Sequence, residues 1–585
     1  MTDPSAETFF GRKLKWLRGN PSRMFLLILL LLGSILHLGW LGHPRQVVFD
    51  EVHFGSFSTA YCCTHKNFFD IHPPHAKLLI GGTAHLLGYN GGVDFAKIGN
   101  DFGDVSPIPL RLMPAIAGIL LPLILFIILR QLGASTTAAF FGGLLVVFDN
   151  GLLLQTRLIA LDGILLAATF GTLALFLAAA RAQTTGRRIG LSFLVGCTMG
   201  LAIGSKITAI AVAGLIALYI AIQIIDDLRW ATIRRWLHQA LWIIAGAFLV
   251  TVLGWALHFA LLTEPGLGDS WGKPSGNLLQ NIVELQRKML DANSSLTATH
   301  PDSSPWWSWP LMKHPLFYYS TPDGPRIYFL GNPLVWWGST VLFIVMSCGL
   351  LYQSMSTKEF KRDARLLWIP IVGYLAAYLP LVRVSRALFM YHYLMPLLFA
   401  ILAGVLWLDR IGWIRPQGLR QQRVSFYAVI VILLGGFIFV SPFTFGFKTG
   451  ASLTEKMLTA FAWIPEQVPS IVAQMQPAEM QSPTDKSALL GDTVSFKWNL
   501  VPGATNYLVW INKIPQAPTR FIESPWLDST VDTWTASGIP TDGSTLYVTL
   551  WTYTPDKRWL AKDYTYTAHT ETPAAKKPKP VSRLN

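Results

Sequence analysis

Two adjacent carboxylates, Asp50 and Glu51, follow the first long apolar stretch of the chain. His53 comes two residues later, and the segment Phe-Phe-Asp-Ile-His-Pro-Pro occupies residues 68–74. Carboxyl and imidazole groups can relay protons, bind metal ions or act in acid–base catalysis, so these roles are all open at this point. Carboxylates beside a membrane-embedded body are costly to desolvate, which makes a functional role the default interpretation.

Several cationic side chains lie at the ends of other apolar stretches. Any one of them has an ordinary explanation as an interface anchor or as half of a buried ion pair. Many segments with charge at the same membrane face are better explained by a shared polar cavity that opens outward. The residues concerned are Arg111, Arg157, Lys206, Arg383, Arg386 and His392, together with Asp149 and Asp162.

The elements that position these side chains are expected to be membrane helices. The chain has 585 residues, of which 52% are hydrophobic and 14% are charged, whereas soluble domains carry roughly 25% charged residues. Apolar runs long enough to cross a bilayer recur between Met24 and Phe445. We expect about eleven transmembrane helices, the first retained as an anchor because no small-residue cleavage site follows it.

The formal net charge of +14 is distributed along the chain in a pattern that predicts which loops lie on which side of the membrane. Lys and Arg cluster in short segments between apolar runs, such as residues 181–188, 229–235 and 358–365. This is the distribution of cytoplasmic loops, and it places the N-terminus inside and the C-terminus outside. Because the basic residues form no single patch, we expect no nucleic-acid partner.

Three substantial segments are expected outside the membrane. The first is an outer loop at about 43–106, which carries Asp50 and Glu51, and the second is a large outer loop at about 263–332 with an amphipathic helix. Alternating short apolar runs separated by turn residues predict a third part, a small fibronectin-III-like β-sandwich. Its predicted limits are a linker at 447–484, the sandwich at 485–570 and a disordered tail at 571–585.

The four cysteines say little about function. Cys197 and Cys348 lie in predicted membrane helices, where packing explains them. Cys62 and Cys63 are adjacent on the outer side, and a strained vicinal disulfide or two free thiols are both compatible with the sequence. No Cys or His spacing typical of a metal site occurs.

One carboxylate base beside a cationic phosphate pocket is a sufficient site for inverting glycosyl transfer from a lipid-linked phosphosugar. Arg and Lys bind the phosphate, and a carboxylate takes the proton of the incoming hydroxyl. Once cations neutralise its charge, the phosphate leaves without a separate acid. A glycosidase differs, because one of its carboxyl groups must protonate the leaving oxygen.

The motifs resemble those of the protein O-mannosyltransferase family, within the GT-C superfamily of polyprenyl-phosphate-sugar-dependent glycosyltransferases. They occur in the family's order over roughly residues 10–446. The segments that carry the resemblance are Asp-Glu-Val-His-Phe-Gly at 50–55, residues 68–79, residues 149–162, residues 300–310, residues 331–337 and residues 386–394.

The resemblance implies a role for each candidate residue. Asp50 would be the catalytic base that activates a Ser or Thr hydroxyl, and Glu51 would shape the site or contact the sugar. Arg111 would bind the lipid phosphate, with Arg157, Arg386 and His392 as further donor-binding candidates. The residues expected to shape the loop near the acceptor are His53, His72, Pro73 and Pro74, and those expected to support the site are Asp149, Asp162 and Lys206.

The resemblance also implies substrates and location. The donor would be polyprenyl-phosphate-mannose, used with inversion and without a cofactor or metal ion. The acceptor would be an exported polypeptide, with the secretion machinery as a partner. Eukaryotic members carry a β-trefoil MIR insertion in the large outer loop, but residues 263–332 are too few to hold one. We therefore expect a bacterial-type member in the inner membrane, with its site and β-sandwich outside the cytoplasm.

Two alternatives keep the charged residues but change the function. One uses the same chemistry on a glycolipid or a cell-envelope glycan, because shared chemistry does not identify the acceptor. The other is a transporter with an intramembrane charge relay. Transporter sites usually lie at the bilayer midplane on broken helices within repeats, whereas these charges are expected at the outer face.

Overall fold

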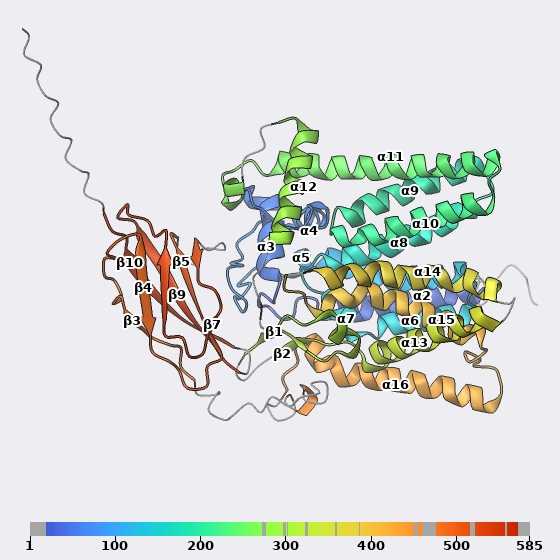
Figure 1. Ribbon diagram of the computed structural model, residues 1–585. Helices are drawn as coiled ribbons and strands as arrows, with labels where there is room; N and C mark the ends of the chain where they lie inside the picture. The colour runs from blue at the N-terminus through green and yellow to red at the C-terminus, as the bar shows by residue number, and fades with distance from the viewer. Residues whose placement is uncertain are drawn as a thin grey trace, which may run out of the picture. The chain divides into compact units, whose positions relative to one another are not determined.

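The computed structural model describes residues 19–271, 276–295, 300, 302–321, 326–356, 360–384, 386–449, 454, 456–458, 475–514, 521–555 and 558–570. It forms two compact units, Met1–Trp463 and Ile464–Asn585, which are described separately (Figure 1).

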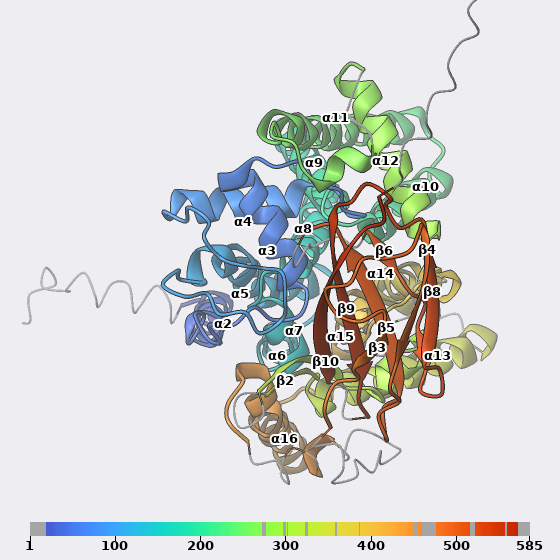
Figure 2. The ribbon, with the colours of Figure 1, turned by 90° about the vertical axis from the view of Figure 1, so that its left-hand side faces the viewer.

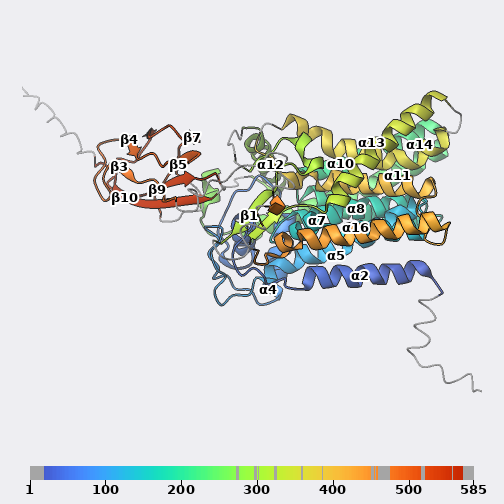
Figure 3. The same cartoon turned by 90° about the horizontal axis from the view of Figure 1, so that it is seen from below.

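The first unit is built from long apolar helices that run alongside one another (Figures 1 and 3). Within the described residues, eight stretches are long and apolar enough to cross a membrane, and Thr136–Val147 and Leu367–Arg383 are shorter apolar helices. A multi-span helical protein is therefore confirmed, while the number eleven stays a prediction. The helices of the bundle are α2 (Pro21–Leu38), α5 (Ile108–Gln131), α6 (Thr136–Val147), α8 (Asp162–Ala180), α9 (Thr185–Ile203), α10 (Ile210–Asp226), α11 (Trp230–Leu261), α13 (Pro333–Ser356), α14 (Phe360–Tyr378), α15 (Leu394–Arg410) and α16 (Arg420–Phe445).

Shorter elements gather at one end of this bundle, on the left in Figure 1. The segment between α2 and α5 supplies α3, the π-helix η2 and α4. The segment between α11 and α13 supplies the predicted amphipathic helix α12 and a two-stranded hairpin that was not predicted from the sequence. The bounds are α3 (Glu51–Thr59), η2 (Ala60–Thr64), α4 (His75–Leu86), α7 (Asn150–Gln155), η3 (Ile207–Ala209), η4 (Leu267–Trp271), α12 (Leu278–Ser295), η5 (Trp306–Leu311), β1 (Leu316–Ser320), β2 (Arg326–Phe329), η6 (Leu379–Arg383) and η7 (Met390–Tyr393).

Glycines allow α9 and α11 to pack backbone against backbone. Gly196 and Gly200 form a small-xxx-small pattern on α9, and Gly246 faces them from α11. A Cβ atom added at Gly196 would lie 2.1 Å from the carbonyl oxygen of Ile243. Close approach of this kind drives helix association in membranes, where the hydrophobic effect gives no preference for a partner helix over lipid. These two helices therefore hold one flank of the bundle together.

The second unit is a two-sheet β-sandwich, as predicted (Figure 2). One sheet has the order β10-β9-β5-β6, with β7 also pairing with β5, and the other has the order β3-β4-β8. Met475 and Ala478 belong to its core, so the unit begins earlier than the predicted residue 485. The predicted tail at 571–585 lies outside the described residues. The strands are β3 (Met480–Ser482), β4 (Thr493–Trp498), β5 (Asn506–Asn512), β6 (Ile522–Glu523), β7 (Leu527–Asp528), β8 (Thr533–Ser537), β9 (Thr545–Tyr553) and β10 (Trp559–Thr567).

The α9–α11 contact can be tested with a matched pair of substitutions in one helix. Gly196→Ala should lower the thermal midpoint of the detergent-solubilised protein by several degrees, because the new methyl group meets backbone atoms that cannot rotate away. Gly190→Ala is the control, since a Cβ there has no heavy atom within 4 Å and alanine favours the helix by about 1 kcal/mol. Equal midpoints for the two variants would contradict the close packing.

Candidate functional site

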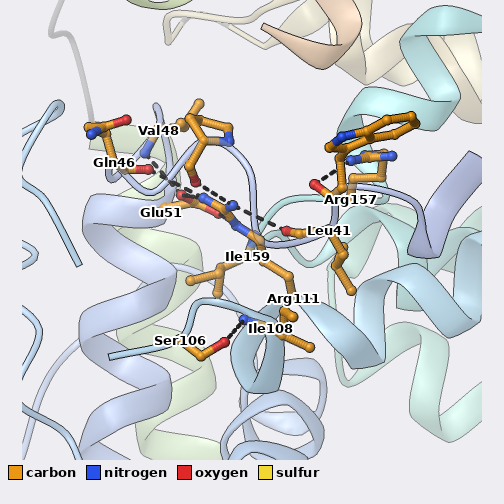
Figure 4. Close-up of polar contacts among 11 residues, drawn as sticks. Leu41, Gln46, Val48, Glu51, Ser106, Ile108, Arg111, Arg157 and Ile159 are labelled. Atoms are coloured by element: carbon orange, nitrogen blue, oxygen red, sulfur yellow. Dashed lines mark hydrogen bonds and ion pairs between the residues drawn. The ribbon is translucent and has the colours of Figure 1, made fainter. Parts of the chain in front are cut away.

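A buried ion pair between Arg111 and Glu51 anchors the start of α3 to α5 (Figure 4). Arg111 is 0% exposed, and its five N–H groups all donate to protein acceptors. Two bonds go to Glu51, with Nε 2.7 Å from Oε1 and Nη2 2.8 Å from Oε2. The others go to the carbonyl oxygens of Leu41, Pro44 and Gln46. Arg111 therefore has no donor left for a phosphate.

Glu51 is equally occupied. Besides the two bonds from Arg111, it accepts one from the backbone N–H of Val48 at 3.0 Å and one from that of Ile159 at 3.0 Å. The pair thus joins the loop before α3, helix α5 and the segment before α8. The expectation that Arg111 binds the lipid phosphate disagrees with this geometry. Of the two roles expected for Glu51, these contacts favour shaping the site over contacting the sugar.

Arg157 is also a structural residue, contrary to its expected role in donor binding. Its guanidinium donates to the carbonyl oxygens of Leu36, Gly39 and Trp40 at the C-terminal end of α2. It also lies 4.6 Å from the ring centroid of Phe445. A cation at the last carbonyls of a helix is stabilising. Figure 4 shows it apart from the Arg111–Glu51 pair.

Asp149 supports the fold from a buried position. Its carboxylate accepts bonds from the backbone N–H of Asn332 at 3.0 Å, from Trp336 Nε1 at 2.9 Å and from the backbone N–H of Leu152 at 2.8 Å. The motifs at residues 149–162 and 331–337 are therefore in direct contact. The predicted supporting role of Asp149 agrees with this geometry.

A second buried ion pair lies closer to Asp50. Lys206 Nζ is 2.8 Å from Asp162 Oδ1, and Gln155 Nε2 is 2.8 Å from Asp162 Oδ2. The hydroxyl of Tyr318, on β1, donates to Gln155. Lys206 was expected to support the site, and the structure brings it to within 5.3 Å of the Tyr391 ring centroid, next to Asp50.

A third ion pair comes from the segment at residues 68–79. Lys77 donates to Asp70 and, at 2.7 Å, to the carbonyl oxygen of His72. Burial lowers the pKa of His72 to about 3, opposed by Asp70 and reinforced by Lys206, Lys77 and Arg386, so its imidazole is neutral at neutral pH. A small cavity beside these side chains is lined also by Pro74 and by residues of α12.

Asp50 and Arg386 take part in none of these three ion pairs. In the part of the chain that the structure describes, the one hydrogen bond to the Asp50 carboxylate is a long one of 3.5 Å from the Tyr391 hydroxyl. Arg386 is partly exposed, has no hydrogen bond to any described residue, and interacts electrostatically with Asp50 and Asp70. The site therefore presents one carboxylate and one guanidinium that are both available to a substrate.

The electrostatic surroundings of Asp50 suit a base. Burial raises the pKa of Asp50, and Asp162 adds to this effect, while His53, Lys206 and the bond from Tyr391 oppose it. A carboxylate with a raised pKa is a stronger base that remains ionised above that pKa. Both features are needed for abstracting a proton from an alcohol.

The remaining predicted residues fall around this cluster. His53 is exposed, one turn after Asp50, and Pro74 is the N-cap of α4 directly after Pro73. His392 is turned toward its own backbone, with Nδ1 3.0 Å from the carbonyl oxygen of Phe389. This contact and the ring stacking of His392 on Tyr391 at 4.6 Å favour a wall residue over a phosphate ligand.

Cys62 and Cys63 form a vicinal disulfide within η2, which selects one of the two states left open by the sequence. Sequence reasoning missed Tyr391, Tyr318 and Lys77 as members of the site. Tyr391 and Lys77 lie inside the motifs that were recognised, but nothing in their spacing indicated which carboxylates they would meet.

The arrangement of the first unit is that of a GT-C glycosyltransferase. It matches the S. cerevisiae protein O-mannosyltransferase Pmt1-Pmt2 complex bound to the sugar donor, with a TM-score of 0.68 and 18% sequence identity. The match covers 78% of this chain and 94% of that chain. A likeness at this identity shows the fold, which is a multi-span membrane fold of the GT-C class.

Sequence comparison identifies the family. A family model described as dolichyl-phosphate-mannose-protein mannosyltransferase matches residues 26–263, and another, for the C-terminal four TMM region of protein-O-mannosyltransferase, matches residues 278–465. The chain belongs to the protein O-mannosyltransferase family, as its motifs predicted.

Curated relatives match over part of their length. Dolichyl-phosphate-mannose–protein mannosyltransferase 4 of Candida albicans is 30% identical over 292 residues, which is 48% of this chain and 38% of the relative. Protein O-mannosyltransferase 1 of Drosophila melanogaster is 33% identical over 244 residues, which is 39% of this chain and 27% of the relative. The matched part of the chain thus spans less than two-fifths of either relative.

The structural role of Arg111 can be separated from a role in binding phosphate. Arg111→Lys should lower the thermal midpoint substantially, because one ammonium cannot replace five directed bonds, and breaking a buried pair costs about 3–5 kcal/mol. Arg386→Lys is the matched control and should leave the midpoint unchanged while weakening use of the donor. A stable Arg111→Lys protein with a raised KM for the donor would show that Arg111 binds substrate after all.

Proposed function

We propose that this protein transfers mannose from a polyprenyl-phosphate-mannose donor to Ser or Thr hydroxyls of exported polypeptides, with inversion at the anomeric carbon. The observation that carries the proposal is the availability of Asp50 beside Arg386, in a cluster whose other carboxylates, Asp70 and Asp162, are held in ion pairs. Family membership supports the choice of mannose and of a protein acceptor.

The reaction needs one base and one stabilised leaving group. An ionised Asp50 accepts the proton of the acceptor hydroxyl as its oxygen attacks C1 of the sugar. The bond between C1 and the phosphate oxygen breaks on the opposite side, and the electron pair leaves with the lipid phosphate. Attack from the face opposite the leaving group inverts the configuration at C1.

Arg386 and Lys206 are the cations proposed to stabilise the departing phosphate. Arg386 offers a planar fork of N–H donors suited to phosphate oxygens. Lys206 spends one N–H on Asp162 and has two more, and it is close enough to Asp50 to lower that residue's pKa. Two fixed cations supply the charge that a divalent ion provides in other phosphosugar transferases, so the proposed mechanism includes no metal ion.

The neutral side chains around Asp50 have positioning roles in this proposal. Tyr391 directs its hydroxyl at the carboxylate, and Phe49 stacks on Tyr318 at 4.2 Å between ring centroids. His72 and Pro74 line a small cavity together with residues of α12, beside the Lys77–Asp70 ion pair. A neutral His72 adds no charge that would repel Arg386 or attract the phosphate away from it.

The basic loops support an orientation in the bacterial inner membrane with the site on the outer side. In that orientation the lipid donor enters from the bilayer, and the acceptor polypeptide arrives from the export route, where the secretion machinery would deliver it. The β-sandwich then lies outside the cytoplasm as well.

Substitution of the base gives the direct test. Asp50→Asn should lower transfer of labelled mannose from polyprenyl-phosphate-mannose to a Ser/Thr-rich peptide by about a hundred- to ten-thousandfold, because the amide cannot accept the proton. Asp104→Asn, a change of an exposed acid in the same outer loop, is the matched control and should transfer normally. Label that enters lipid instead of peptide would reassign the acceptor, and unchanged transfer by Asp50→Asn would reject the mechanism.

The pH dependence offers an independent check. The active form has an ionised Asp50, so transfer should fall as the pH drops through the raised pKa of this carboxyl. His53 opposes that rise, so His53→Gln should raise the pKa further and move the acid limb of kcat/KM to higher pH. His85→Gln, which removes an exposed histidine from α4, should leave the limb in place. A limb that does not move in His53→Gln would argue against Asp50 as the titrating group.

A further inference from the structure

Aromatic side chains form a continuous layer on the outer face of the five-stranded sheet of the second unit. We call this layer the aromatic platform and define it by Trp510, Trp526, Trp551, Tyr553 and Trp559. The ring centroids of Trp551 lie 4.8 Å from those of Trp510 and 5.8 Å from those of Trp559. Trp559 in turn lies 5.1 Å from Trp526 and 4.7 Å from Tyr553.

The platform is separate from the core of the sandwich. Side chains alternate along each strand, and the inward positions of β5 and β9, such as Val509 and Leu550, fill the core. Trp510 and Trp551 occupy the outward positions of the same strands, and Trp559 pairs with Tyr553 across β10 and β9. The four tryptophans are partly exposed, whereas Tyr553 is buried. Filling the sandwich therefore does not explain the tryptophan rings, and a partly exposed cluster of large aromatic residues is typical of a binding surface.

The polar residues beside the platform identify the kind of ligand. Apart from the buried Leu508, the remaining outward positions of β5, β9 and β10 carry small, hydroxyl, amide and carboxyl groups, and none of them is Lys or Arg. Thr549 Oγ1 donates to Asp563 at 2.6 Å among them. These outward residues are Leu508, Asn512, Thr545, Tyr547, Thr549, Ala561, Asp563, Thr565 and Thr567.

This composition matches a neutral sugar better than a membrane. An anionic lipid surface requires basic residues around the aromatic ones, and the outward strand positions have none. A pyranose has a face of C–H groups that rests on the negative face of an indole ring. Its hydroxyls project from the edge, where amide, hydroxyl and carboxyl groups can exchange hydrogen bonds with them.

We propose that the aromatic platform binds mannose units on polypeptides that already carry them. This inference rests on the proposed function, since the ligand is the product of that reaction. A product held by the second unit remains tethered to the protein, which raises the effective concentration of its remaining hydroxyls at the transferase site. The β-sandwich would thus make modification of Ser/Thr-rich polypeptides repetitive.

Binding can be measured with the full-length protein in nanodiscs of neutral lipid. The probe is a fluorescent O-mannosylated peptide, with the same unmodified peptide as its control, and Asp50→Asn as background to prevent turnover. Trp551→Ala and Trp559→Ala should each weaken binding of the mannosylated peptide at least tenfold. Trp551→Tyr, which keeps a flat ring, should retain most of it. Leu490→Ala, at a residue of the same unit that is 93% exposed, should bind as the parent does.

Three results would overturn the inference. Equal binding of both peptides would make the platform a polypeptide surface, and platform-dependent binding to anionic vesicles would make it a membrane surface. Unchanged affinity in a folded Trp551→Ala protein would place the ligand elsewhere.

Transfer by the wild type, assayed in parallel with an unmodified peptide, distinguishes failure of the inference from failure of the proposed function. Mannoside binding without transfer would reject the function, and transfer without mannoside binding would reject the platform.

Discussion

The Glu51–Arg111 ion pair is the interaction on which the candidate site depends. Burying two charges is costly, and the cost is offset here because every donor of Arg111 and every oxygen of Glu51 has partners. The pair fixes the first turn of α3 against α5 and against the segment before α8. Asp50, the preceding residue, is thereby positioned in the polar cluster, where the described residues give its carboxylate one long hydrogen bond, from the Tyr391 hydroxyl.

Two further ion pairs determine which charges in the cluster are available to a substrate. Lys77 neutralises Asp70 and Lys206 neutralises Asp162, so these two carboxylates beside Asp50 are stabilised as ions. Arg386 interacts electrostatically with Asp50 and has no hydrogen bond to any described residue. This arrangement suits two substrates, an acceptor that supplies a hydroxyl and a donor that supplies a phosphate.

Much of this architecture could be predicted from the sequence, because apolar runs and alternating strands follow from local periodicity. The family motifs likewise identified Asp50 and Arg386, and the position of Lys206 between two apolar runs identified it as a candidate. The sequence could not predict that Arg111 and Arg157 are structural residues while Arg386 is available to a substrate. An arginine at a helix end has the same spacing whether its partners are carbonyl oxygens or a phosphate. The β1–β2 hairpin could have been predicted, because Pro322, Asp323 and Gly324 form a strong turn signal between two aromatic-rich segments. The start of the sandwich before residue 485 was missed because its residues show no strong alternation.

Asp149 has a consequence for how the transmembrane unit is assembled. Its carboxylate lies in the segment matched by the first family model, while Asn332 and Trp336, which donate to it, lie in the segment matched by the second. Asn150 reinforces the junction by donating to Thr444 at 2.9 Å. The two halves therefore recognise each other through buried polar groups that lipid cannot satisfy. A chain interrupted between residues 264 and 277 would retain this recognition, so separately synthesised halves have the means to find one another within the bilayer.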